Sequence, residues 1–186
     1  MIIVGITGTL GAGKGTVVDH LKDKYDFKHY SARDFLTAEV IKRGLPVNRD
    51  SMVEVGNDLR AKNHPGYIVE QLYKLAFADG HNAVIESVRT PGEIDVLENL
   101  PNFYLVAVDA ETKIRYDRIV LRNSSTDNVS FDHFKADEER EMTSVDPNKQ
   151  NLAACIKRAK YLFLNNGSFE DLFVQVDEMV NQINHV

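Results

Sequence analysis

Residues 8–16 read "GTLGAGKGT", and this short stretch decides the fold class of the chain. It follows the apolar run "IIVGIT" at 2–7 and precedes a helical pattern that begins at 14. Its spacing matches G-x-x-x-x-G-K, the pattern of a phosphate-binding loop (P-loop), in which backbone N–H groups, a helix N-terminus and a lysine ammonium attract one anion. The residues expected to hold a phosphate are Gly8, Gly11, Ala12, Gly13, Lys14 and Gly15.

Short apolar runs alternate with longer amphipathic segments along the rest of the chain. Nearly continuous apolar runs suit parallel strands that are covered on both faces. The alternation therefore predicts a three-layer α/β fold, a five-stranded parallel sheet with helices on both faces. The expected strands are 2–7, 27–31, 82–87, 103–108 and 161–165, and the expected helices are 14–24, 34–43, 51–62, 66–78, 91–99, 111–122, 131–142, 149–158 and 169–184. Three helix starts are signalled by Ser51 with Glu54, by Pro91 and by Ser168.

Length and composition indicate one globular domain over 1–186, because 186 residues with 43% hydrophobic and 27% charged side chains suffice for one core. A net charge of -6 argues against electrostatic attraction to nucleic acid or to an anionic membrane. The single cysteine, Cys155, allows no intrachain disulfide and is expected to be buried. The first residues are too short an apolar stretch for a membrane span and lack the basic start of a signal peptide, so we expect a cytoplasmic protein.

One position departs from the general P-loop pattern, because Gly15 stands where a magnesium-binding Ser or Thr is usual, and Thr16 follows. In this "GxxGxGKGT" form the chain resembles adenylate kinase and its nucleoside monophosphate kinase relatives. The resemblance implies ATP or GTP as donor, Mg²⁺, and a small-molecule nucleotide as acceptor. It also implies that Thr16 helps to hold the α-phosphate of the donor.

Three further stretches extend the resemblance in the same order along the chain: "YSARDFL" at 30–36, "ESVRT" at 86–90 and "YDRIVLR" at 116–122. They are similar to the start of the acceptor helix, to the acidic and basic residues after the third strand, and to the helix that leads into the lid. The resemblance implies catalytic roles for Lys14, Asp34, Arg89 and Arg122, donor binding by Arg118, acceptor binding by Ser31 and Arg89, and Mg²⁺ held through water by Glu86 and Asp34. Arg118 and Arg122 share a helix face, so one would stack on the donor base and the other reach the transferred phosphate, or the two form a solvated basic stripe.

The acceptor side departs from the family pattern, because Thr37 stands where the family has an arginine, three residues beyond the aspartate of the acceptor helix, Asp34. Arg33, Arg43 and Arg60 are the candidate substitutes within 33–70, the expected acceptor-binding segment. We favour Arg60, which shares a helix face with Asn57. The polar segment 123–150 is either a lid over the site or a solvated helix pair, and its Arg140 either closes on the site or joins a surface ion pair.

The C-terminal stretch "AKYLFLNNGSFEDLFVQV" at 159–176 is similar to dephospho-coenzyme A kinase and to a group of uncharacterised archaeal proteins related to it. Three functions therefore stay open. The first is a nucleoside monophosphate kinase. The second is a dephospho-coenzyme A kinase, whose ribose hydroxyl acceptor needs a carboxylate such as Asp34. The third is a nucleotide-sensing binding protein with a degenerate kinase domain, suggested by the missing acceptor arginine.

Overall fold

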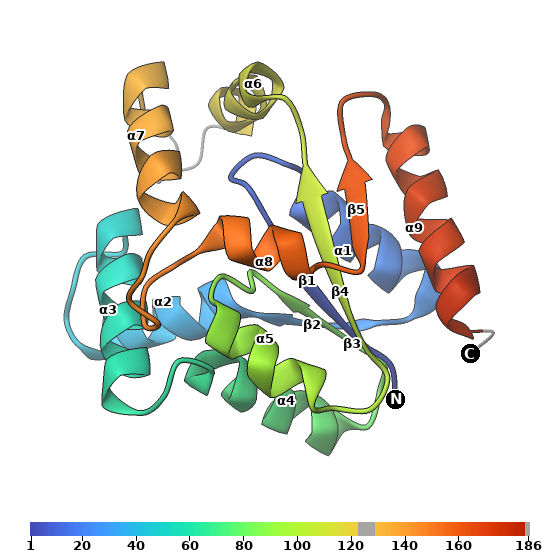
Figure 1. Ribbon diagram of the computed structural model, residues 1–186, viewed down its shortest axis with the longest axis horizontal. Coiled ribbons are helices and arrows are strands. Elements are labelled where there is room, and N and C mark those ends of the chain that lie inside the picture. Colours follow the sequence, from blue (N-terminus) through green and yellow to red (C-terminus); the bar gives the residue numbers. More distant parts are fainter. Residues whose placement is uncertain (123–128, 185–186) are drawn as a thin grey trace.

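The five expected strands are all present and form one parallel sheet in the computed structural model, which describes residues 1–122 and 129–184 (Figure 1). The strand order is β2-β3-β1-β4-β5, and each neighbouring pair is parallel. The predicted α/β fold class is therefore confirmed. The strands are β1 (Ile3–Gly8), β2 (Lys28–Ser31), β3 (Ala83–Glu86), β4 (Phe103–Asp109) and β5 (Tyr161–Leu164).

The expected helices are also present, with ends that differ by up to three residues from those predicted. Pro91 stands in the first turn of its helix, and Ser168 accepts a hydrogen bond from the backbone of Asp171 at 3.2 Å. The helices are α1 (Lys14–Tyr25), α2 (Ala32–Lys42), α3 (Arg49–Lys62), α4 (Tyr67–Asp79), α5 (Pro91–Glu98), α6 (Thr112–Arg122), α7 (Phe131–Met142), α8 (Leu152–Arg158) and α9 (Phe169–Asn184).

The predicted start of α3 at Ser51 is wrong. The helix begins at Arg49, and the side chain of Asn48 caps it by accepting a hydrogen bond from the backbone N–H of Ser51 at 2.9 Å. An asparagine caps a helix as well as a serine does, so the capping role passes to the residue that precedes the first turn.

Apolar side chains fill both spaces between the sheet and its helices, as the continuous apolar strands predicted. Successive residues of a strand point to opposite faces, so Val4 and Ile6 pack with α1 and α9, whereas Ile3 packs with α4 and α5. Cys155 of α8 is buried in the second of these layers, as expected, and this burial, together with the charge of Glu93, raises its thiol pKa to about 12.

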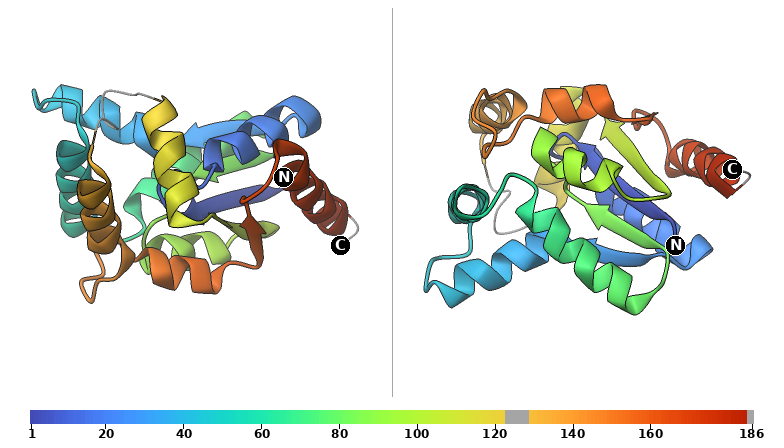
Figure 2. Two further views of the ribbon diagram at one scale, coloured as in Figure 1. Left: turned by 90° about the horizontal axis from the view of Figure 1, so that it is seen from above. Right: turned by 60° about the horizontal axis from the view of Figure 1, so that its bottom comes forward.

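The carboxyl ends of the parallel strands lie at one edge of the sheet, where ligands of such folds bind. Helices α2, α3, α6 and α7 stand around this edge, and α7 lies beside α3 (Figures 1 and 2). Of the expected lid at 123–150, residues 123–128 lie outside the described residues. Residues 129–150 hold α7 and an irregular segment after it, so this stretch is not a helix pair. In the described ranges no helix has the length and apolar character needed to cross a membrane.

Candidate functional site

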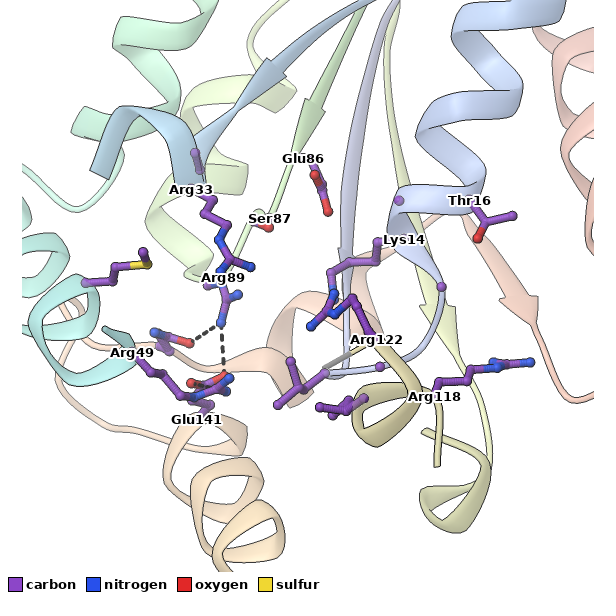
Figure 3. Close-up of a pocket in the computed structure, with 18 of the residues that line it drawn as sticks. Lys14, Thr16, Arg33, Arg49, Glu86, Ser87, Arg89, Arg118, Arg122 and Glu141 are labelled. Atoms are coloured by element: carbon purple, nitrogen blue, oxygen red, sulfur yellow. Dashed lines mark hydrogen bonds and ion pairs between the residues drawn. The ribbon is translucent and has the colours of Figure 1, made fainter. Parts of the chain in front are cut away.

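A cavity of about 490 Å³ lies at the carboxyl edge of the sheet. The P-loop forms one wall, α2 and α3 form the opposite wall, and α6, α7 and the segment after β3 close the remaining sides (Figure 3). Its charged lining residues are Lys14, Asp19, Arg33, Arg49, Arg60, Glu86, Arg89, Arg118, Arg122 and Glu141. Seven of these ten side chains are basic, so the cavity is suited to an anionic ligand.

The P-loop takes a shape that only glycine permits at two of its turns. Gly11 and Gly13 have φ of 78° and 99°, a backbone region that residues with a Cβ rarely adopt. A Cβ at Gly11 would lie 2.4 Å from the carbonyl oxygen of Arg115, and one at Gly13 would lie 2.2 Å from Nδ2 of Asn165. A side chain at either position would therefore be strained and would collide with its neighbours, which explains why both turns contain glycine.

Most of the residues that the sequence assigned to phosphate binding line the cavity, namely Gly11, Gly13, Lys14, Gly15 and Thr16. Gly8 and Ala12 do not. Gly8 packs against the backbone of Val108, and Ala12 is fully buried beneath the loop. These two residues therefore support the loop from behind.

The ammonium group of Lys14 lies within the curve of the P-loop. It donates hydrogen bonds to the carbonyl oxygens of Gly8 at 2.9 Å and Thr9 at 2.7 Å. Burial, with a smaller contribution from the positive charge of Arg89, lowers the pKa of Lys14 to about 7, although Glu86 acts in the opposite direction. An anion in the loop would supply the negative charge that these surroundings lack.

Glu86 ends β3, and its carboxylate lies near Lys14 in the cavity (Figure 3). Burial alone would raise the pKa of Glu86, but His29, whose Nε2 is 3.2 Å from Oε2 of Glu86, and the charge of Lys14 lower it below the usual range. An ionised carboxylate here fits a Mg²⁺ ion that is held mainly by phosphates and water. Among the described residues, no three acidic, histidine or cysteine side chains gather into a metal site of their own.

Two of the three arginines of α6, Arg118 and Arg122, reach the cavity, as the resemblance implied. Arg118 donates from Nη2 to Oδ1 of Asn165 at 3.3 Å, while its Nη1 is buried without a hydrogen-bond partner. Asn165, 2% exposed, also donates from Nδ2 to the carbonyl oxygen of Ala12 at 2.8 Å. This asparagine thus connects Arg118 to the P-loop. The only sequence signal for this role is that Asn165 directly follows a strand, at the edge of the sheet where the P-loop lies.

Arg89 follows β3 and reaches the cavity as predicted, but its partners are residues that sequence reasoning missed. Its Nη1 is 2.9 Å from Oε2 of Glu141 and donates to Oε1 of Gln150, also at 2.9 Å (Figure 3). The other carboxylate oxygen of Glu141 accepts from Nη2 of Arg49 at 2.6 Å. Arg49, Glu141 and Gln150 belong to no recognisable motif, so the sequence held no signal for them.

Arg60, the arginine favoured for acceptor binding, has its guanidinium bound to another side chain. Its Nε and Nη2 donate to Oε1 of Glu93 at 3.1 and 2.7 Å, and the two side chains are 4% and 1% exposed. The second carboxylate oxygen of Glu93 accepts from the backbone N–H groups of Arg89 at 2.6 Å and Thr90 at 3.1 Å. Arg60 therefore neutralises the buried carboxylate that fixes the backbone of Arg89.

The two residues expected to open the acceptor helix do not line the cavity. The hydroxyl of Ser31 accepts a hydrogen bond from the backbone N–H of Asp34 at 3.1 Å and thereby caps α2. The side chain of Asp34 is exposed, and neither residue is part of the cavity wall. Arg33, which precedes Asp34 and was a less favoured acceptor candidate than Arg60, does face the cavity (Figure 3).

The two remaining arginine candidates lie outside the cavity wall. Arg43 pairs with Asp58 at 2.7 Å. Arg140 pairs with Asp50 at 3.2 Å and with Asp137 at 2.9 Å, which is the surface ion pair that was one of its two expected roles. Both guanidinium groups are thus engaged with carboxylates of neighbouring helices.

Comparison with known proteins identifies both the family and the fold. The model of a family described as an AAA domain matches residues 7–135. A UPF0200 protein of Pyrobaculum aerophilum is 27% identical over 183 residues, which are 97% of this chain and 98% of that protein. The crystal structure of TT1252 from Thermus thermophilus has a TM-score of 0.63 at 24% identity and covers 97% of both chains. Shikimate kinase of Bacteroides thetaiotaomicron has a TM-score of 0.61 at 12% identity and covers 98% of both. The chain therefore has the P-loop kinase fold.

Proposed function

We propose that this chain, which belongs to the AAA domain family whose model matches residues 7–135, is an ATP-dependent phosphotransferase that moves the γ-phosphoryl group to a nucleoside or deoxynucleoside monophosphate. The observation that carries the proposal is the convergence of the P-loop with Arg33, Arg49, Arg89, Arg118 and Arg122 on one cavity. Two phosphorylated substrates repel each other, so an enzyme that transfers a phosphoryl group between them needs several positive charges in one cavity.

The donor half of the site is formed by the P-loop and α6. Backbone N–H groups of the loop and the ammonium of Lys14 would hold the β- and γ-phosphates. Arg118, with its unpartnered Nη1, and Arg122 face the same space from α6. Mg²⁺, when bound, would neutralise the phosphate oxygens, and Glu86 is the ionised carboxylate that would orient its water ligands.

The acceptor half is formed by α2, α3 and the segment after β3. Leu36, Met52 and Val53 supply an apolar wall for a base, and Arg33, Arg49 and Arg89 supply charge for a phosphate. Transfer breaks the bond between the γ-phosphorus and the bridging oxygen of the donor and forms a bond from that phosphorus to an oxygen of the acceptor. The protein contributes by holding the two reactants in line and by stabilising the charge on the moving oxygens.

The arrangement gives less support to the two alternative functions. A dephospho-coenzyme A kinase needs a carboxylate beside the attacking hydroxyl, and Asp34, the candidate for it, is exposed outside the cavity wall. A nucleotide-sensing protein would bind the donor through the same P-loop but would not transfer its phosphoryl group. If ATP binds but no acceptor stimulates turnover, the nucleotide-sensing function is favoured.

The test is release of ADP from ATP and Mg²⁺ with a panel of AMP, CMP, UMP, GMP, dCMP, dTMP and dephospho-coenzyme A. One nucleoside monophosphate should stimulate the rate, and Lys14→Ala should lower that rate at least about 100-fold, because it removes a charge from the reacting phosphates. Lys157→Ala, an exposed lysine of α8, is the matched control. Stimulation by dephospho-coenzyme A alone, or by none of the panel, would contradict the proposal.

A further inference from the structure

Two arginines that face the cavity hold one carboxylate, that of Glu141 near the end of α7 (Figure 3). Nη2 of Arg49 lies 2.6 Å from Oε1, and Nη1 of Arg89 lies 2.9 Å from Oε2. Guanidinium groups on both oxygens of a carboxylate are the arrangement by which proteins bind the oxyanion of a ligand. Here the oxyanion belongs to the protein itself.

This cluster differs from the sealed pair of Arg60 and Glu93, in which the arginine side chain is only 4% exposed. The side chains of Arg49 and Arg89 are 19% and 28% exposed, and both line the cavity. They therefore keep one side open to a ligand. Glu141, whose side chain is 4% exposed, reaches them from α7.

Helix α7 is attached to the molecule in two different ways. Near its start, the buried Phe134 packs against Tyr116 of α6, with ring centroids 5.6 Å apart, and one turn further on Glu138 pairs with Arg115 of α6. Towards its end, it meets α3 and the segment after β3 through ion pairs, namely Arg49–Glu141, Arg49–Asp137, Arg89–Glu141 and Arg140–Asp50. An ion pair that borders a solvated cavity can exchange its carboxylate for another anion without loss of apolar burial, whereas the aromatic attachment cannot.

We propose that Arg49 and Arg89 form the site for the phosphate group of the acceptor, and that Glu141 occupies this site from within the protein until the acceptor replaces it. Binding of the acceptor then releases the end of α7 from α3 while its aromatic start stays attached to α6. Glu141 is thus an intramolecular competitor that sets the acceptor affinity, and Arg49 takes the acceptor-binding role that the sequence suggested for Arg60. That the ligand is a nucleotide acceptor rests on the proposed function. Replacement of the Glu141 carboxylate on Arg49 and Arg89 requires only that the ligand carry an oxyanion.

The first test is calorimetric titration with inorganic phosphate. Glu141→Gln should bind phosphate about tenfold more tightly than Glu139→Gln, an exposed site on the same helix with the same change of charge. Adding Arg49→Gln to Glu141→Gln should abolish the gain. Phosphate bound in the P-loop is common to all these variants and cancels in the comparison. Equal affinities of the Glu141 and Glu139 variants would overturn the proposal.

The same titrations with acetate separate the two chemical sources of an oxyanion. A phosphate acceptor predicts a gain in Glu141→Gln that is larger for phosphate than for acetate, because phosphate offers more charge and more acceptor oxygens to the two arginines. A gain for acetate with none for phosphate would overturn the assignment to a phosphate group.

A second measurement needs no variant. Hydrogen exchange of the unmodified protein should become faster at amides 140–142 when inorganic phosphate is added, while amides from Phe134 to Glu138, the part of α7 attached to α6, stay protected. Unchanged exchange at 140–142 would overturn the release of the end of α7. These readouts do not depend on turnover. If they appear and no nucleotide stimulates ADP release, the oxyanion site stands and the proposed acceptor fails.

Discussion

Arg60 and Glu93 form a buried ion pair in which Nε and Nη2 of the arginine both donate to Oε1 of the carboxylate, at 3.1 and 2.7 Å. The second oxygen of Glu93 accepts hydrogen bonds from the backbone of Arg89 and Thr90. The pair is therefore almost fully buried in the wall of the cavity, where it fixes the backbone that presents Arg89. This relationship makes Arg60 a residue that positions the site.

The first prediction concerns stability. Arg60→Met should lower the free energy of unfolding by about 3–5 kcal/mol, because it leaves the buried charge of Glu93 uncompensated. Removing both charges with Arg60→Met and Glu93→Gln should recover part of this loss. Arg43→Met, which breaks the less buried pair with Asp58, should lower it by only about 0–1 kcal/mol. Urea unfolding measures all three, and equal effects of the two single substitutions would contradict the assignment.

The second prediction concerns pH and nucleotide binding. Because the pKa of Lys14 is lowered from 10.5 to about 7, this side chain is largely neutral above that pH. A bound polyphosphate favours the ammonium form and raises the pKa again, so binding of ATP should take up a proton at about pH 8 and should weaken as the pH rises from about 7 to 9. Calorimetry in buffers of different ionisation enthalpy measures the uptake. Lys14→Met should show none from this site.

The lowered pKa of Lys14 has the opposite effect on folding: stability should rise with pH, whereas ATP binding should weaken. The folded protein binds fewer protons at Lys14 than the unfolded chain does between about pH 7 and 10.5, so the free energy of unfolding should rise with pH across this range. The destabilisation is fully present below about pH 7. The difference in stability between Lys14→Met and the unmodified protein should therefore shrink as the pH increases, and a difference that does not vary with pH would refute the shifted pKa.

The third prediction concerns the shape of the P-loop. Gly13→Ala should destabilise the protein by about 1–3 kcal/mol, because φ is 99° and the new Cβ would lie 2.2 Å from Nδ2 of Asn165. Gly15→Ala is the matched substitution two residues away, where a Cβ would meet no atom within 4 Å. It should leave the stability unchanged within about 0.5 kcal/mol or raise it slightly. Thermal unfolding of the two variants gives the comparison.

The fourth prediction concerns magnesium. Glu86→Gln removes the ionised carboxylate beside Lys14, so the Mg²⁺ concentration for half-maximal activity should rise about tenfold. Affinity for ATP without Mg²⁺ should increase, because a negative charge near the phosphates is lost. Asp34→Asn tests the other metal candidate and should leave the Mg²⁺ dependence unchanged, since Asp34 is exposed outside the cavity wall. An effect of Asp34→Asn as large as that of Glu86→Gln would restore Asp34 to the metal site.

Local patterns in the sequence were enough for the strands, the helices and the P-loop. The apolar run at 2–7 and the spacing of Gly8, Gly13 and Lys14 act over a few residues, and the structure places β1, the loop and α1 where these patterns predicted. Even locally the prediction has limits, as the start of α3 shows. Asn48 and Ser51 are both good caps, and the choice between them depends on where the helix can begin against its neighbours.

Sequence by itself thus determined the fold and the phosphate-binding loop of this protein, because periodicity and loop chemistry are properties of adjacent residues. Only the tertiary structure decided which arginines serve the cavity. An arginine is held by the nearest carboxylate in space, and these partners lie far apart in the chain, at sequence separations of 33 for Arg60 and Glu93 and 92 for Arg49 and Glu141. The fold brings Glu93 of α5 to Arg60 and Glu141 of α7 to Arg49, so the guanidinium of Arg60 is sealed in a buried ion pair while that of Arg49 stays partly open to the cavity.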